Sequence, residues 1–108
     1  MKAPTDTAAA NVATGAALLA LVLHPRDDVA TALRALPAGK AVHVQGLARA
    51  GDGICLREPI GLCHKFALHD IASGAMVRKY GEAIGRATRD IRAGEHVHTH
   101  NLKSNRAA

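Results

Sequence analysis

The chain has 108 residues, which is enough for one small domain, and its formal net charge of +5 favours an anionic partner. Aromatic residues make up only 2%, so few rings could stack on bases, and the basic residues are scattered; both features argue against a nucleic-acid binder. Apolar residues make up 48%, so a core can form, but it has to be built from Val, Ile, Leu and Ala.

The start of the chain predicts a tail followed by a strand. Residues 1–15 are rich in Ala and Thr, and we expect a flexible N-terminal tail there, one folded domain over residues 16–103, and a C-terminal tail over residues 104–108. The apolar run from Ala16 to Leu23 is too short to span a membrane and predicts a buried strand. We therefore expect no association with a membrane. Two cysteines do not form a disulfide framework, so we expect a reducing, cytoplasmic setting.

The next segment predicts the one short α-helix of the domain. Val29, Leu33 and Leu36 repeat at helical spacing. Asp27 and Asp28 stand before them, where a carboxylate can accept hydrogen bonds from the free N–H groups of a helix. The sequence Pro-Ala-Gly directly after Leu36 would end the helix.

A short motif then recurs three times: an apolar residue, two spacers, Gly, two spacers and Val. The copies span residues 36–42, 71–77 and 91–97. In each copy the Gly can adopt the positive φ of a turn, and the Val can enter a new strand. Short strands separated by such turns predict a small, mainly β domain with many bends.

Several segments resemble a known family. HPRDDVATALRALPAG begins at His24, and GLCHKFALHDI, VRKYGEAIGRATRDI and AGEHVHTHNLKSN follow in this order from Gly61 onward. Together they resemble the amino-terminal module of the altronate/galactarate dehydratase family, a SAF-type domain with a β-clip fold. One departure is Cys63, which stands where the family usually has Gly.

The resemblance implies a function. In this family the module is either fused to a larger catalytic region or made as a separate small subunit. We therefore expect a lyase small subunit, inactive or nearly so alone, that acts with a large catalytic subunit on a hydroxy-carboxylate substrate. The resemblance also implies a divalent metal, Fe²⁺ or Mn²⁺. Elimination of water from altronate or galactarate is the first expectation, and elimination of sulfite from sulfolactate is the alternative, since the sulfolactate sulfo-lyases are related.

Two further properties stay open at this point. SAF-type domains also occur in recognition proteins, so a binding module without catalysis is a second class of function. The chain is also small enough that self-association into a homo-oligomer is a possibility.

The stretch GEHVHTHN places histidines at positions 96, 98 and 100. On a strand these side chains share one face, with neighbours ~7 Å apart, close enough for two rings to bind one metal. A solvent-facing strand that happens to be rich in histidine would give the same pattern. In the family the matching element is His-x-His-Asn, which implies His98 and His100 as metal ligands and Asn101 as a substrate contact. His96, nearest the turn, is left out.

Other candidate residues have equally ordinary alternatives. His64 and Lys65 could be a surface pair, but the resemblance implies an acid–base or ligand role for His64 and a carboxylate-binding role for Lys65. Asp28 would either cap the predicted helix or contact substrate. Tyr80 would be a half-buried core ring or a hydroxyl donor to substrate. Cys63 would be a small packed residue or a soft metal ligand.

Overall fold

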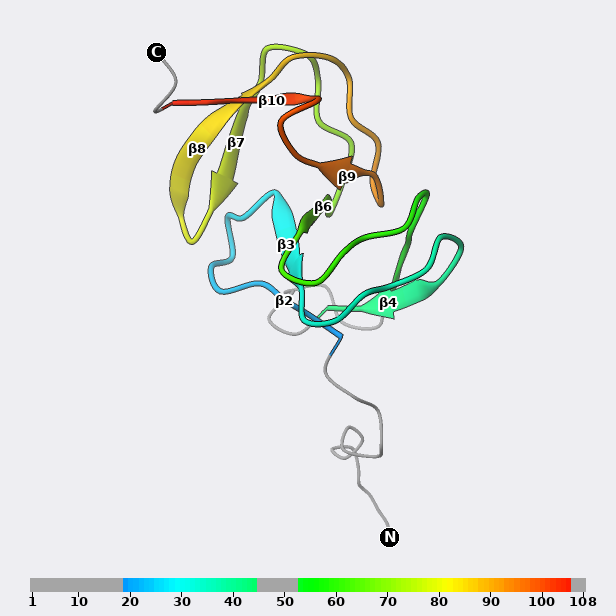
Figure 1. Ribbon diagram of the computed structural model, residues 1–108. Helices are drawn as coiled ribbons and strands as arrows, with labels where there is room; N and C mark the ends of the chain where they lie inside the picture. The colour runs from blue at the N-terminus through cyan, green and yellow to red at the C-terminus, as the bar shows by residue number, and fades with distance from the viewer. Residues whose placement is uncertain (1–18, 45–52, 106–108) are drawn as a thin grey trace, which may run out of the picture.

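A computed structural model describes residues 19–44 and 53–105. Within these ranges the chain forms antiparallel strands and no helix (Figure 1). The strands are β2 (Ala20–Leu21), β3 (Val29–Ala32), β4 (Ala41–His43), β5 (Gly53–Cys55), β6 (Lys65–Ala67), β7 (Met76–Lys79), β8 (Glu82–Ala87), β9 (His96–Val97) and β10 (Leu102–Ser104). The expectation of a mainly β domain is confirmed.

The strands form three small sheets. A four-stranded sheet has the order β2-β3-β6-β9, a three-stranded sheet has the order β10-β8-β7, and β4 pairs with β5. The four-stranded sheet joins segments far apart in sequence, because β3 pairs with β6 and β6 pairs with β9. In Figure 1 this sheet lies between the β7–β8–β10 sheet and the β4 region.

The four-stranded sheet is buried on both faces. Neighbouring residues of a strand point to opposite faces, and Phe66 of β6 packs into one apolar cluster while Ala67 packs into another. The first cluster includes Leu36, Leu56 and Ile60, and the second includes residues of β7, β8 and β9. Aliphatic residues supply nearly all of this core, as the composition predicts.

The predicted helix after Asp28 is wrong. Val29–Ala32 is strand β3, paired on one side with β2 and on the other with β6. A run of apolar residues this short fits either a helix or a buried strand, and here pairing with two other strands favours the strand. Likewise, the strand predicted over residues 16–23 is reduced to β2, and residues 16–18 lie outside the described part, as does the predicted tail over residues 1–15.

The two aspartates stabilise a hairpin instead of a helix. Asp27 is only 6% exposed, and its carboxylate accepts hydrogen bonds from the backbone N–H groups of Tyr80 (2.9 Å) and Gly81 (2.8 Å). Tyr80 and Gly81 both have positive φ and form the two-residue turn between β7 and β8. An aspartate carboxylate does accept hydrogen bonds from free backbone N–H groups, as predicted, but these groups belong to a β-turn and not to a helix.

The repeated Gly motif marks turns, as predicted, and residues 60–66 form a fourth turn of this kind, with Cys63 in the position of the Gly and Phe66 in that of the Val. Gly39, Gly74 and Gly94 have φ of 82°, 84° and 87°, and Cys63 has φ of 68°. In each case the backbone N–H donates to a carbonyl of a neighbouring segment, at 2.7 to 2.8 Å. Cys63 thus adopts a backbone conformation that favours Gly, and its side chain is exposed rather than packed as expected.

We expect Cys63→Gly to stabilise the domain by about 0.5–1 kcal/mol, because it removes left-handed strain that exceeds the added chain entropy of Gly. Thermal unfolding monitored by circular dichroism would show a melting temperature higher by a few degrees. Cys55→Gly is the matched control, since Cys55 is also exposed but lies in strand β5; it should lower the melting temperature. An equal decrease of the melting temperature in the two variants would show that the backbone at Cys63 is not strained.

Described structure continues into the segment that is predicted to be the C-terminal tail, residues 104–108. Strand β10 runs to Ser104, and the Asn105 side chain donates a hydrogen bond to the Ala83 carbonyl at 3.0 Å. Residues 106–108 of the predicted C-terminal tail lie outside the described part. No helix among the described residues is long and apolar enough to cross a membrane.

Candidate functional site

The pairing of β6 with β9 brings histidines from two distant segments together. Lys65 is paired with Val97 at the end of this ladder. His64 directly precedes Lys65 and His98 directly follows Val97, so these two histidines occupy the next opposed positions. Opposed residues in an antiparallel pair point to the same side. His96, two residues before His98, points to this side as well.

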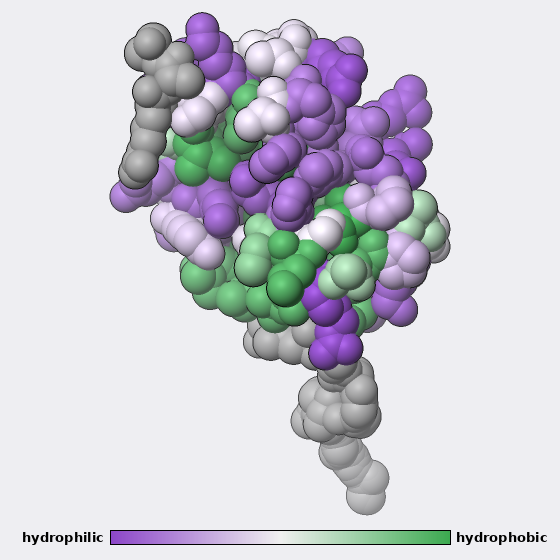
Figure 2. Space-filling view, in the orientation of Figure 1, coloured by the Kyte–Doolittle hydropathy of each residue, from purple (hydrophilic) through white to green (hydrophobic). Residues whose placement is uncertain are grey.

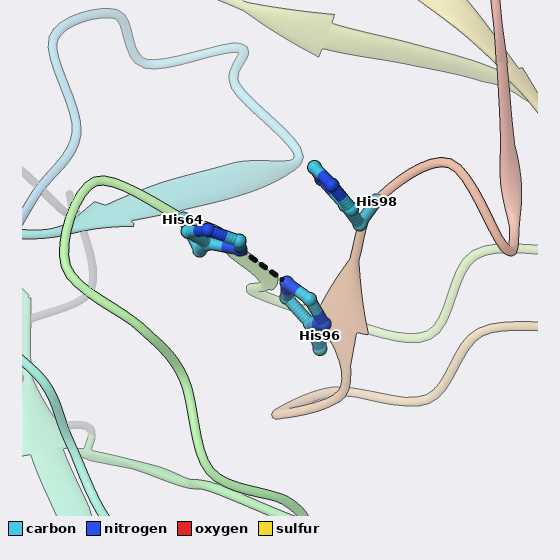
Figure 3. A group of neighbouring side chains, drawn as sticks. All are labelled: His64, His96 and His98. Atoms are coloured by element: carbon cyan, nitrogen blue, oxygen red, sulfur yellow. Dashed lines mark hydrogen bonds between the residues drawn. The ribbon is translucent and has the colours of Figure 1, made fainter.

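The three imidazoles form one cluster. His64 Nδ1 and His96 Nε2 are 2.8 Å apart, a hydrogen-bonding distance. The ring centroids of His64 and His98 are 4.9 Å apart, and those of His96 and His98 are 5.3 Å apart and nearly parallel. Figure 3 shows His64 on the loop that leads into β6, His96 on β9, and His98 just beyond β9, with the rings gathered between the two segments.

This cluster has the donor set of a metal site. One nitrogen from each ring can be chosen so that all three lie within 4.8 Å of one another. Three neutral imidazole nitrogens suit first-row transition metals, including iron, and three protein ligands leave positions for water or substrate. The hydrogen bond between His64 Nδ1 and His96 Nε2 also requires that one of these two nitrogens carries no hydrogen, which is the form in which an imidazole nitrogen binds a metal.

The side chains of Asn101 and Glu58 fix the backbone that carries His96 and His98. Asn101 is 2% exposed; its side-chain oxygen accepts from the His98 N–H at 2.9 Å, and its side-chain nitrogen donates to the His96 carbonyl at 2.8 Å. The Glu58 carboxylate accepts from the His96 N–H at 3.0 Å. These contacts set the direction of the rings without touching them.

The cluster lowers the proton affinity of its members. Burial of the ring, followed by the nearby charges of His64 and His98, lowers the pKa of His96 from its usual 6.5, although Glu58 acts in the opposite direction. The pKa of His98 is also lowered, by desolvation and then by the charges of His64, Lys65 and His100. At neutral pH both rings are therefore in the unprotonated form that binds metal.

These lowered pKa values predict a pH-dependent stability for the metal-free chain. In the unfolded chain His96 and His98 regain their usual pKa of about 6.5, so below that pH the unfolded state binds more protons than the folded state. The free energy of unfolding should therefore be highest above pH ~6.5, decrease as the pH falls toward the lowered pKa values of the folded state, and then level off. Urea unfolding at a series of pH values would measure this. A His96→Gln, His98→Gln double variant should show a flatter dependence, and an unchanged slope would contradict the assignment.

The other predicted residues lie at different distances from the cluster. His100 is exposed and its ring centroid is 5.4 Å from that of His96, but it is not one of the three histidines whose nitrogens converge. Lys65, next to His64, is partly buried and lines a cleft together with His98. Asn101 is adjacent, but both polar atoms of its side chain bind backbone, as described above.

Asp28 and Tyr80 belong to the neighbouring hairpin. Asp28 accepts hydrogen bonds from His69 Nε2 and from the Arg78 N–H, each at 2.8 Å. Tyr80 lies at the tip of the β7–β8 hairpin, 52% exposed, with the Lys79 ammonium 4.7 Å from the centre of its ring. The contacts of Asp28 are structural, and a contact of Asp28 or Tyr80 with substrate stays a prediction.

Sequence reasoning left out His96 and did not single out Glu58 or Lys79. The alternation of the three histidines shows that His96 shares a face with His98, but only the β6–β9 register places it against His64. Glu58 and Lys79 carry no local pattern that separates them from other surface charges. Lys79 does, however, directly precede Tyr80 in the segment that carries part of the family resemblance.

The sequence model of the altronate/galactarate dehydratase SAF domain matches residues 18–105. The chain is 47% identical over 83 residues to altronate dehydratase of Escherichia coli and 39% identical over 83 residues to that of Bacillus subtilis, which covers 77% of this chain but only 16% of each relative. It is also 45% identical over 51 residues to the (2R)-sulfolactate sulfo-lyase subunit alpha of Chromohalobacter salexigens, covering 47% of this chain and 54% of that subunit.

Proposed function

The chain belongs to the altronate/galactarate dehydratase SAF domain family, and from this premise we propose that it is the small subunit of a carbon–oxygen lyase. The enzyme would eliminate water from a sugar acid such as altronate or galactarate. A separate large subunit would supply most of the active site, and the chain alone would be inactive. The observation that carries the proposal is the convergence of His64, His96 and His98.

In this proposal the three histidines hold Fe²⁺ or Mn²⁺. When bound, the metal would supply positive charge for the enediolate that forms when the carbon next to a carboxylate loses its proton. The donor set fits, because three imidazole nitrogens already face one another. For His64, the position of its Nδ1 against His96 favours the ligand role over the acid–base role.

Lys65 is proposed to hold the substrate carboxylate. It lines the cleft that His98 also lines, so an acid bound there would have its carboxylate near one member of the cluster. Burial and the charge of Lys79 lower the pKa of Lys65, and a bound carboxylate would offset that repulsion. The lysine would thus orient the acid, while the proton acceptor and the group that assists the leaving hydroxyl come from the large subunit.

A partner of this kind has support on the surface. Leu23 and Leu62 are each 58% exposed and Leu33 is 37% exposed. Figure 2 shows hydrophobic side chains gathered on the lower half of this face, in the region of β2 to β4, whereas hydrophilic ones dominate the upper half. Apolar surface of this sort is typical of a protein–protein contact. The sulfolactate relatives are themselves named as subunits.

A second candidate is the small subunit of a sulfolactate sulfo-lyase, a carbon–sulfur lyase. It is favoured by the similarity to subunit alpha of that enzyme in Chromohalobacter salexigens and in Paracoccus pantotrophus. The same cluster and lysine would serve, because sulfite loss also begins with proton loss next to a carboxylate. A binding module without catalysis is the third candidate.

Co-expression with a large dehydratase-like polypeptide tests the proposal. The purified complex would be assayed on altronate, galactarate and (2R)-sulfolactate, with Fe(II), with Mn(II) and after chelation. A 2-oxo acid formed from a sugar acid, only with metal, is the expected result. Sulfite release from sulfolactate alone would favour the second candidate. A complex that forms but transforms none of the three acids, or no complex at all, would favour the binding module.

A further inference from the structure

The segment between β5 and β6 holds the turn that leads into β9. The Arg57 N–H donates to the Gly94 carbonyl at 3.0 Å, and Arg57 Nε donates to the Ala93 carbonyl at 3.2 Å. One residue further on, the Glu58 carboxylate accepts the hydrogen bond from the His96 N–H at 3.0 Å. Among the described strands β9 is an edge of its sheet, so Glu58 provides an acceptor where no further strand follows.

Glu58 carries a negative charge that this hydrogen bond does not require. A neutral oxygen would satisfy the same N–H group, and Glu58 is partly buried, which disfavours an unpaired charge. Within residues 19–44 and 53–105, the one ion pair closer than 4.0 Å joins His69 to Asp28, so no cationic side chain neutralises Glu58 at that distance. The fold alone therefore leaves a carboxylate without a counter-charge beside the histidine cluster.

The other charges that act on the cluster are positive. Burial lowers the pKa of His96 most, nearby histidines lower it further, and Glu58 alone acts in the opposite direction. Burial likewise lowers the pKa of His98 most, followed by the charges of neighbouring histidines and of Lys65, with no negative group among the causes. A divalent cation held by three neutral imidazoles would add further positive charge that no ligand neutralises. Glu58 is the described negative group that is placed to reduce this excess.

We propose that Glu58 is a positioning residue that also balances charge at the histidine cluster: it strengthens the binding of a divalent cation by His64, His96 and His98 without contacting that cation. The hydrogen bond fixes the main chain of His96, and the negative charge lowers the free energy of the bound cation. The inference rests on the metal site of the proposed function and goes further, because it assigns part of the metal affinity to a residue that is not a ligand.

Two substitutions separate the charge from the hydrogen bond. Glu58→Gln keeps a side-chain oxygen that can accept from the His96 N–H and removes the charge, whereas Glu58→Ala removes both. Calorimetric titration of the full chain with Mn(II) at low ionic strength should show an affinity about tenfold lower in Glu58→Gln. In Glu58→Ala it should be about 100-fold lower, because the main chain of His96 is also released. The melting temperature should be kept in Glu58→Gln and fall in Glu58→Ala.

Glu82→Gln is the control. It makes the same charge change at an exposed position of β8, and Glu82 is not among the groups that act on the pKa of His96 or His98, so Mn(II) affinity should stay unchanged. An equal loss in Glu82→Gln would indicate net charge alone and overturn the inference. Unchanged affinity in Glu58→Gln, with a loss only in Glu58→Ala, would leave the hydrogen bond as the sole contribution and overturn it as well. So would a wild-type chain that binds no Mn(II).

The outcome is separable from that of the proposed function. A chain that binds Mn(II) more weakly after Glu58→Gln, but forms no active complex with a large polypeptide, would support the role of Glu58 and contradict the lyase. A complex with metal-dependent dehydratase activity, in which Glu58→Gln leaves Mn(II) affinity unchanged, would contradict that role and leave the lyase intact.

Discussion

His96→Ala should lower the affinity of the chain for Mn(II) or Fe(II) by at least about 100-fold and abolish metal-dependent lyase activity of the complex. Loss of a partner that merely orients a ligand costs 10–100-fold, and His96 would be a direct ligand with a nitrogen within 4.8 Å of those of His64 and His98. Calorimetric titration with Mn(II) measures the affinity. His64→Ala and His98→Ala should have effects of the same size.

Two controls make this test sharp. His43 is exposed on β4, in the separate β4–β5 sheet, and is not one of the three clustered histidines, so His43→Ala should leave metal affinity unchanged. His100→Ala separates the two possible ligand sets: a severe loss in His100→Ala with a mild one in His96→Ala would restore the pair His98 and His100 that the family resemblance implies. Melting temperatures of the variants would confirm that each one folds.

Gly94→Ala should destabilise the domain by about 3 kcal/mol or more, a large part of the stability of a small domain. Gly94 has φ of 87°, and a Cβ built there would overlap the backbone carbonyl of Cys55. Its N–H donates to the Ala67 carbonyl at 2.8 Å and its carbonyl accepts from the Arg57 N–H at 3.0 Å, so the segment cannot move away without losing both bonds. Thermal and urea unfolding would measure the loss.

Gly74→Ala is the matched control for this prediction. Gly74 occupies the same position in the repeated motif with φ of 84°, but a Cβ there would have nothing within 4 Å. It should cost only the left-handed strain, about 1–2 kcal/mol. Gly94→Ala should also reduce metal affinity where it still folds, since Gly94 lies two residues before His96, whereas Gly74→Ala should not. Equal destabilisation by the two changes would contradict the predicted overlap.

Local sequence information was sufficient for the three turns that contain Gly in the repeated motif. Three copies of the Gly motif predicted positive φ at Gly39, Gly74 and Gly94, because only Gly adopts that conformation without strain. The fourth copy was missed, since Cys63 occupies the Gly position and nothing in its side chain signals the turn. A pattern found by residue type cannot detect a site where the backbone conformation is kept at the cost of strain.

The helix was mispredicted for a related reason. The spacing of Val29, Leu33 and Leu36 fits a helix, but the first belongs to a four-residue strand and the last pairs with Ile60 in an isolated bridge. In a domain with strands this short, periodicity extends over too few residues to separate the two structures. Pairing with β2 and β6, which no local window contains, decided the outcome.

The sequence by itself determined the class of the domain, its turns and which residue types were available for chemistry: seven histidines, a His-Lys pair and an alternating His-x-His-x-His stretch. Only the tertiary structure decided which of them meet. The register of β6 against β9 places His64 beside His96 and His98, and tertiary packing brings Lys65 of β6 and Lys79 of β7 to one cleft. Alternation along a strand fixes the face on which a side chain lies, but the partner opposite that face is set by long-range pairing of segments some thirty residues apart.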